Sequence, residues 1–171
     1  MAAIADAAGV SVETIYLSIG NKPTLVRHLV ETALSGTDEP VPPTRRRGVR
    51  EIHLEPDPRR KIELFARMVR AVEERVAPIW QLVLEAAPSD AELRRIVEEL
   101  RVRHVGSMGI ATKHITKGAR LRRGISPDIA RDVVWAMNSP EFYRLLVVGR
   151  GWTGAKFEKW LADAWKRLLL D

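Results

Sequence analysis

Few residues in this chain could do covalent or metal chemistry, and their spacing argues against it. The 171-residue sequence has no cysteine, which removes disulfides, thiolate ligands and cysteine nucleophiles. The four histidines, His28, His53, His104 and His114, show no metal-ligand spacing. No serine, histidine and aspartate form a recognisable nucleophile motif. We therefore predict that the protein is not an enzyme and uses no metal and no cofactor.

One glycine-rich segment needs separate attention. Gly149–Gly154 matches the dinucleotide-binding pattern G-x-G-x-x-G. That pattern holds a pyrophosphate only where it follows a strand and opens a crossover helix. Helical patterns flank it on both sides, so we interpret it as an interhelical turn.

Recognition of a nucleic acid is the chemistry that the N-terminal segment favours. Residues 2–8 are strong helix formers that end at Gly9, and Ser11 is suited to cap a second helix over residues 12–19. A third helix follows from Pro23, which completes the spacing of a helix-turn-helix unit. Five apolar residues are expected to form its small core: Ile4, Ala8, Val10, Ile15 and Ile19. The second helix then presents Val12, Glu13, Thr14 and Leu17 outward, with Tyr16 and Ser18 beside them.

Several short strings in this segment are distinctive. They are Ile4-Ala5, Ala8-Gly9-Val10-Ser11, Ile15-Tyr16 and Gly20-Asn21-Lys22. Together they strongly resemble the second helix, turn and recognition helix of the TetR family of bacterial transcriptional repressors. The closing segment, from Ser139-Pro140-Glu141 through Gly151-Trp152 to Trp160-Leu161, is similar to the ligand-sensing domain of one branch of that family.

The resemblance assigns roles to individual residues. It implies that Val12, Glu13, Thr14 and Leu17 meet base edges, while Tyr16, Ser18 and Lys22 contact phosphates. Leu17 cannot donate a hydrogen bond, so its readout would be apolar, as with a thymine methyl group. Ile19 stands where family members usually carry an aromatic residue.

The resemblance also implies a further helix ahead of Met1. Two alternatives follow: the coding sequence starts further upstream, or the protein has lost part of its DNA-binding unit. In the second case the chain would be a helical small-molecule sensor or a protein-interaction dimer. The first 36 residues carry two basic against three acidic side chains, a net −1, while the whole chain carries +6. Binding of DNA must therefore depend on individually placed groups rather than on bulk charge.

The rest of the sequence also predicts helices, so the fold class is all-α. Residues 36–58 hold five of the ten prolines, which predicts a linker or irregular crossing over residues 37–57. This divides the chain into a DNA-binding segment (1–36), the linker (37–57) and a helical regulatory and dimerisation domain (58–171). Within the last, Pro78 is expected to interrupt one helix and Ser89 to cap a long one.

A pocket and an interface complete the hypothesis. Helices between about residues 60 and 120 are expected to enclose a pocket for a small apolar effector. Its predicted lining is Trp80, His104, Met108, Trp135 and Phe142. The helix over 127–148 and the last helix are expected to form a four-helix interface in a homodimer. Its candidate residues are Phe157, Trp160, Leu161, Ala164, Trp165 and Leu168.

These elements predict a cytoplasmic, ligand-responsive repressor that binds a palindromic double-stranded DNA operator as a dimer. We find no apolar run long enough to cross a bilayer and therefore expect no membrane association.

Overall fold

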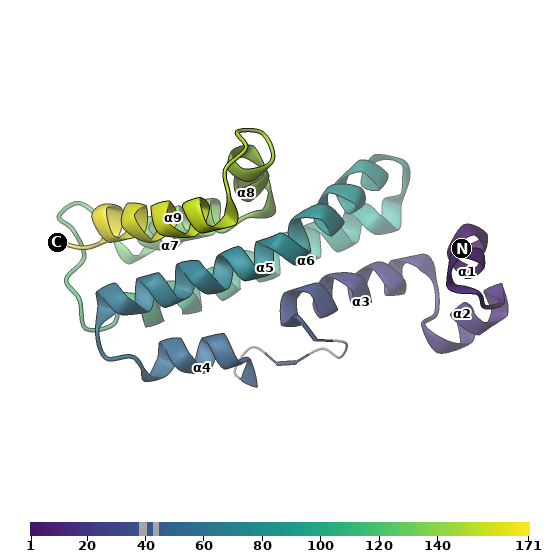
Figure 1. Cartoon of the computed structure of the whole chain (residues 1–171), viewed down its shortest axis with the longest axis horizontal. Helices are drawn as coiled ribbons and strands as arrows, with labels where there is room; N and C mark the ends of the chain where they lie inside the picture. The colour runs from purple at the N-terminus through teal and green to yellow at the C-terminus, as the bar shows by residue number, and fades with distance from the viewer. Residues whose placement is uncertain (38–40, 43–44) are drawn as a thin grey trace.

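The computed structural model describes residues 1–37, 41–42 and 45–171, and over that range it is all-α, as the sequence predicts (Figure 1). The helices are α1 (Ala2–Ala8), α2 (Val12–Ser18), α3 (Lys22–Ser35), α4 (Arg47–Leu54), α5 (Pro58–Ala86), α6 (Ala91–Ile115), α7 (Pro127–Met137), α8 (Pro140–Val147) and α9 (Gly154–Leu169). A 3-10 turn, Ala87–Ser89, joins α5 to α6. The β-structure in the described part is one isolated antiparallel bridge between Leu121 and Leu170.

Side-chain caps set where most helices begin. Ser11, Asn21, Asp57, Asp90, Ser126, Ser139 and Thr153 each accept a hydrogen bond from a backbone N–H of the first turn that they precede. The predicted cap of α6 was wrong by one residue. The Asp90 carboxylate accepts from both Glu92 and Leu93, whereas Ser89 lies in the 3-10 turn.

Two prolines affect the helices differently. Pro78 does not interrupt its helix, against the prediction, because α5 continues through it. Pro140 begins a new helix, so residues 127–148 form α7 and α8, which are divided at Asn138 and Ser139. A proline is compatible with the first helical position, where its missing N–H would have no intrahelical partner.

The predicted linker contains a helix. α4 occupies residues 47–54 and packs Ile52 into the main core. Its sequence signal is short and lies between two groups of prolines, which hid its periodicity. Pro40 and Pro43, on which the linker prediction also depended, lie outside the described residues.

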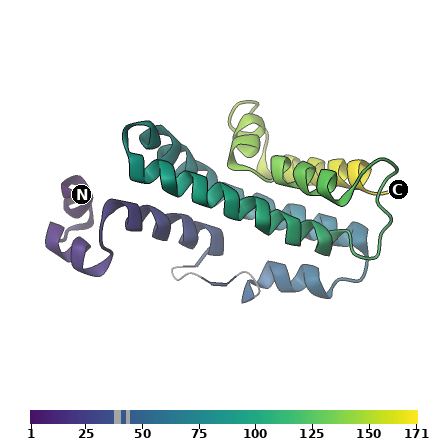
Figure 2. The ribbon, with the colours of Figure 1, turned by 180° about the vertical axis from the view of Figure 1, so that it is seen from behind.

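The main core joins α5 to α4, α6, α7, α8 and α9 (Figure 2). Phe65 of α5 and Trp165 of α9 stack with their ring centroids 5.2 Å apart. Both side chains are almost completely buried. This core buries large apolar side chains on every helix from α4 onward, which makes it the main source of stability.

A second core fixes α3 against the α5–α6 hairpin. Val30 and Ala33 of α3 pack with Trp80 and neighbouring apolar residues. On the same helix Leu29 is exposed, so the buried face of α3 runs through Val30 and Ala33. At the edge of this core Arg27 donates two hydrogen bonds to Glu99, at 2.6 and 2.7 Å.

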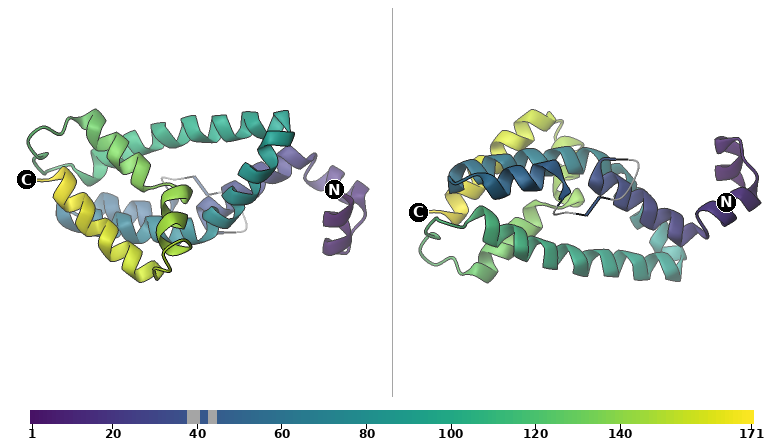
Figure 3. Two further views of the ribbon diagram at one scale, coloured as in Figure 1. Left: turned by 90° about the horizontal axis from the view of Figure 1, so that it is seen from above. Right: turned by 90° about the horizontal axis from the view of Figure 1, so that it is seen from below.

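The N-terminal helix pair, α1 and α2, projects from the end of α3. Figure 3 shows it standing away from the helical body (α3–α9), at the opposite end from the C-terminus. Since α3 is held by the second core, the pair has a fixed point of attachment to that body.

Candidate nucleic-acid interface and interior polar cluster

The turn between α1 and α2 is set by local hydrogen bonds. Gly9 adopts the left-handed conformation at φ 66°, which a residue with a Cβ rarely adopts. Its N–H donates to the Asp6 carbonyl, and the N–H of Val10 donates to the Ala5 carbonyl at 3.0 Å. This is the hydrogen-bond pattern that ends many helices at glycine. It turns the chain directly into α2.

Ser11 fixes the start of α2. Its Oγ accepts from the Thr14 backbone N–H at 3.1 Å and lies 3.1 Å from Thr14 Oγ1. The small core beneath is thinner than predicted. Ala5 and Ile15 are buried and Ile19 is half-buried, whereas Ile4, Ala8 and Val10 are exposed. Two fully buried side chains therefore hold the helix pair together.

The predicted DNA-contacting residues lie on an open face. Leu17 is 88% exposed. Glu13, Thr14, Tyr16, Ser18 and Lys22 are also exposed, and Val12 is half-buried. None of their side chains packs into either core of the helical body. α2 thus presents one apolar, one aromatic and several polar side chains outward.

Charges on this face are mixed. A backbone hydrogen bond and then a hydrogen bond with Ser11 lower the pKa of Glu13, which keeps its carboxylate ionised at neutral pH. The Lys22 Nζ lies 3.9 Å from Asp90 at the start of α6. This places a cation beside α2 while tying it loosely to the helical body.

Inside that body lies a polar cluster that the sequence analysis found only in part. Trp80 of α5 donates from Nε1 to Glu141 Oε1 of α8 at 2.9 Å. His104 of α6 is close enough to Glu141 for that carboxylate to act on its pKa, although burial, the larger influence, lowers it. Glu73 of α5 and Tyr143 of α8 complete the set. We call these five residues the Glu73 cluster.

The predicted pocket residues are divided by the structure. Trp80 and His104 belong to the Glu73 cluster, and Met108 lies one turn after His104, where its Sδ accepts from Asn138 Nδ2 at 2.8 Å. Phe142 instead stacks on Trp160, with centroids 6.0 Å apart. Trp135 is on the surface of α7. The predicted apolar pocket is therefore replaced by an interior of mixed polarity around the first three residues.

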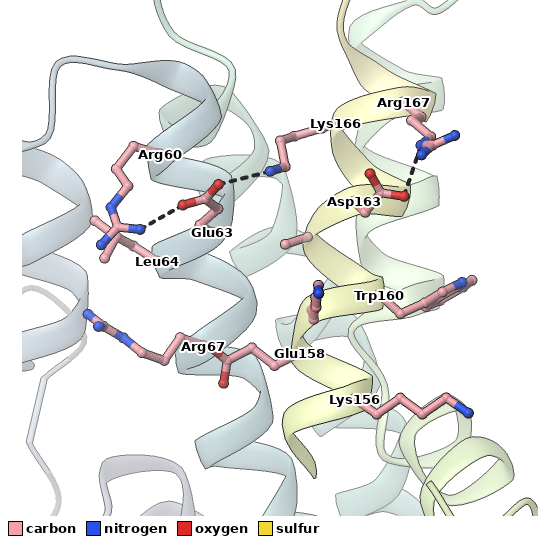
Figure 4. Close-up of a pocket in the computed structure, with 12 residues that line it drawn as sticks. Arg60, Glu63, Leu64, Arg67, Lys156, Glu158, Trp160, Asp163, Lys166 and Arg167 are labelled. Atoms are coloured by element: carbon pink, nitrogen blue, oxygen red, sulfur yellow. Dashed lines mark hydrogen bonds and ion pairs between the residues drawn. The ribbon is translucent and has the colours of Figure 1, made fainter. Parts of the chain in front are cut away.

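An open groove with a volume of about 760 Å³ lies between α5 and α9 (Figure 4). Its walls are mostly charged, and no predicted pocket residue lines it. Glu63 bridges the groove by accepting from Arg60 at 2.6 Å and from Lys166 at 2.9 Å. The bond to Lys166, followed by that to Arg60, lowers the pKa of Glu63. Six basic against three acidic side chains line the groove, so its charge is positive on balance.

The predicted interface residues fall into two groups. Phe157, Leu161 and Trp165 have no exposed surface, because they fill the main core of their own chain. The prediction that they meet a partner is wrong. Trp160 and Leu168 are 39% and 42% exposed, and Ala164 is half-buried. The apolar face of α9 is broad, so one edge of it packs into the core while the other edge stays exposed to solvent.

Comparison of the chain with protein-family models, with curated proteins and with solved structures gives no match. In the described part of the chain no helix is both long and apolar enough to span a bilayer. Across the same residues no three histidine, aspartate or glutamate side chains are grouped to hold a metal ion. The functional argument therefore depends on the geometry of α2 and of the Glu73 cluster.

Proposed function

We propose that this protein is a ligand-responsive transcriptional repressor that inserts α2 into the major groove of an operator as a homodimer. The observation that carries the proposal is the outward face of α2, with Leu17 88% exposed on a helix fixed by the Ser11 cap. A helix presented in this way fits the width of the major groove. The resemblance of this segment to TetR-type repressors supports the same function.

Each exposed residue has a distinct role in the proposal. Thr14 and Glu13 offer hydrogen-bonding groups to base edges, where a carboxylate pairs best with the amino group of cytosine. Leu17 contacts a thymine methyl group. Tyr16, Ser18 and Lys22 contact phosphates and so fix the register without reading sequence.

Dimerisation places two α2 helices on one palindromic site. The exposed Trp160 and Leu168 of α9, with Ile129 and Trp135 of α7, are the apolar residues assigned to the contact with a second copy. In Figure 1 α7 and α9 both lie on the side of α5 away from α4. Half-site spacing is then set by the distance between the two helix pairs.

In this proposal Trp80 transmits effector binding to the helices that contact the operator. Trp80 packs against α3 in the second core and also bonds Glu141 of α8. A ligand that moves Glu141 therefore acts on the helix that carries α1 and α2. The size of the response is limited by the difference in ligand affinity between the two conformations.

Two substitutions test the assigned roles. Tyr16→Ala is expected to weaken binding to operator and random DNA alike and to reduce the salt dependence, because it removes a phosphate contact. Thr14→Ala is expected to reduce discrimination between sequences, by roughly 1 kcal/mol or more. Fluorescence anisotropy on a selected operator and a random duplex at several salt concentrations measures both.

Leu82→Ala, at an exposed leucine of α5, is the control. Equal loss of discrimination in both variants would contradict the roles.

One observation favours a second candidate, a helical sensor or interaction dimer that does not bind DNA. Ile4 and Val10 are exposed on the helix pair, so its core is thin. Repeated selection from a random duplex pool separates the two candidates. Enrichment of a palindromic sequence supports the repressor, and recovery of unenriched DNA by a stable dimer supports the sensor.

A further inference from the structure

Glu73 is a carboxylic acid in the interior without an apparent structural purpose. It is 4% exposed, and its Oε2 atom is buried without a hydrogen-bond partner among the described residues. A buried polar atom with no partner costs free energy, and a buried charge costs more. An apolar residue at this position of α5 would pack without that cost.

The positively charged side chains near Glu73 already form ion pairs with other carboxylates. Arg70, one turn earlier on α5, pairs with Glu74 at 2.7 Å and with Glu158 at 2.8 Å. Arg101 of α6 lies 3.9 Å from Glu141 and 3.5 Å from Glu98. Arg101 therefore lies beside Glu141, whereas no ion pair reaches Glu73 itself among the described residues.

The neighbouring titratable groups do not supply a cation. Burial, and after it the nearby Glu141 carboxylate, raises the pKa of Glu73 to about 8. Burial lowers the pKa of His104, which keeps the imidazole neutral at pH 7. Burial also raises the pKa of Tyr143, which therefore stays a neutral phenol. The cluster is poised to accept a positive charge from outside the chain.

We propose that the Glu73 cluster binds an organic ammonium cation, whose charged head lies between Glu73 and Glu141 and whose apolar body contacts Trp80 and Tyr143. Aromatic rings beside a carboxylate are the usual surroundings of such a head group, because both attract positive charge. The Glu141 side chain is 47% exposed, so the cluster reaches the surface at one point. This inference rests on the proposed function, since it names the chemical class of the effector.

The proposed occupant also explains how the signal leaves the site. A cation that pairs with Glu141 competes with the bond from Trp80 Nε1. Trp80 is the member of the cluster that packs in the second core with α3. Loss of that bond frees Trp80 to move against the helix that carries α1 and α2.

Isothermal titration calorimetry on the full chain at pH 7 tests the proposal. The probes are 2-phenylethylammonium, tetraethylammonium and n-hexylammonium, with 2-phenylethanol and n-hexanol as neutral counterparts. We expect the ammonium probes to bind roughly tenfold more tightly than the alcohols. Because Glu73 is mostly protonated at pH 7, binding should also release about one proton per ligand. Titrations in two buffers of different ionisation enthalpy measure that release.

Two variants separate the site from non-specific attraction. Glu73→Gln keeps the shape of the side chain and is expected to abolish both the proton release and the preference for ammonium probes. Glu85→Gln, at an exposed position of the same helix, should change neither. Circular dichroism confirms that both variants are folded.

Three outcomes would overturn the proposal: no binding of any ammonium probe, equal affinity for ammonium and alcohol, or unchanged binding in Glu73→Gln. These titrations contain no DNA. Operator binding without ammonium binding would therefore refute this inference alone, and ammonium binding without operator binding would refute the proposed function alone.

Discussion

The N-terminal helix pair and the helical body are stabilised in very different ways. In the pair, Ala5 and Ile15 are the buried apolar side chains, and Ile4 and Val10 remain exposed. In the body, two cores bury aromatic and aliphatic residues from every helix between α3 and α9. Stability in a folded chain follows apolar burial, so the two regions should not unfold with the same free energy.

This difference in apolar burial indicates that the helix pair and the helical body have different tasks. α2 is held by short-range devices, namely the Gly9 turn and the Ser11 cap, which fix its direction without a large core. The body holds the buried carboxyl group of Glu73 and the large aromatic residues, where a ligand could change packing. α3 belongs to the second core and therefore connects the two regions.

The largest expected effect comes from removing a residue of the main core. Trp165→Ala should lower the free energy of unfolding by about 3–5 kcal/mol, because the indole is completely buried and stacks on Phe65. Urea unfolding followed by circular dichroism measures the loss. Trp160→Ala, on the open edge of α9, is the control and should cost much less in the monomer. Equal losses would show that α9 is not divided into a core edge and an open edge.

The pH dependence of stability should come from the body. The ordinary pKa of Glu73 is 4.5, and burial raises it to about 8 in the folded chain. Below the ordinary value both states hold the proton, so the contribution of Glu73 is fully present. As the pH rises from about 4.5 to about 8, the unfolded state ionises first and stability falls, by up to about 1.4 kcal/mol per pH unit.

Glu73→Gln is therefore expected to flatten this fall and to be more stable than the wild type at pH 8, by an amount on the order of a few kcal/mol. Urea titrations at several pH values measure the slope. Glu13 provides the contrast from the helix pair, since its pKa is lowered rather than raised and its side chain is exposed. An identical slope in the wild type and Glu73→Gln would contradict the assignment.

Within the helix pair, Ile15→Ala should produce a local effect. Ile15 is one of its two buried side chains, so its loss is expected to cost about 2 kcal/mol, at the low end for a core residue. Hydrogen exchange should show faster exchange in α1 and α2, with α5 and α9 unchanged. Faster exchange throughout the chain would show that the pair and the body unfold as one unit.

Local signals made most of the fold predictable from the sequence. Gly9, Ser11 and Ser126 mark helix ends by backbone chemistry that depends on adjacent residues alone. Asp90 and Ser89 are adjacent cap candidates, and only the geometry shows that the Asp90 carboxylate reaches two N–H groups. α4 was missed because prolines on both sides of a single amphipathic stretch predict a loop.

The interior site was less predictable, since it depends on which helices meet. Trp80 and His104 were among the residues that the sequence predicted to line a pocket. Glu73 follows Val69 at helical spacing and so shares its buried face, a signal that the sequence contained. The electrostatic influence of Glu141 of α8 on Glu73 could not be predicted, because the two residues lie on helices that are far apart in the chain. For the same reason the sequence could not divide the apolar face of α9 between core and surface.

The smallest expected effect comes from removing either of two matched helix caps. It tests most directly whether the helix pair and the helical body are stabilised differently. Ser11 and Ser139 make the same bond, each accepting from the backbone N–H three residues later at 3.1 Å. Ser11→Ala and Ser139→Ala should each cost about 1 kcal/mol of helix stability. In Ser139→Ala the loss should appear in global urea unfolding, because α8 contributes Tyr143 to the main core. In Ser11→Ala global unfolding should be nearly unchanged, while exchange of the α2 amides accelerates and operator affinity falls.

If both variants instead lower the global free energy of unfolding equally, α2 is coupled to the body as tightly as α8. The contrast between a locally fixed helix pair and a densely packed body would then be wrong.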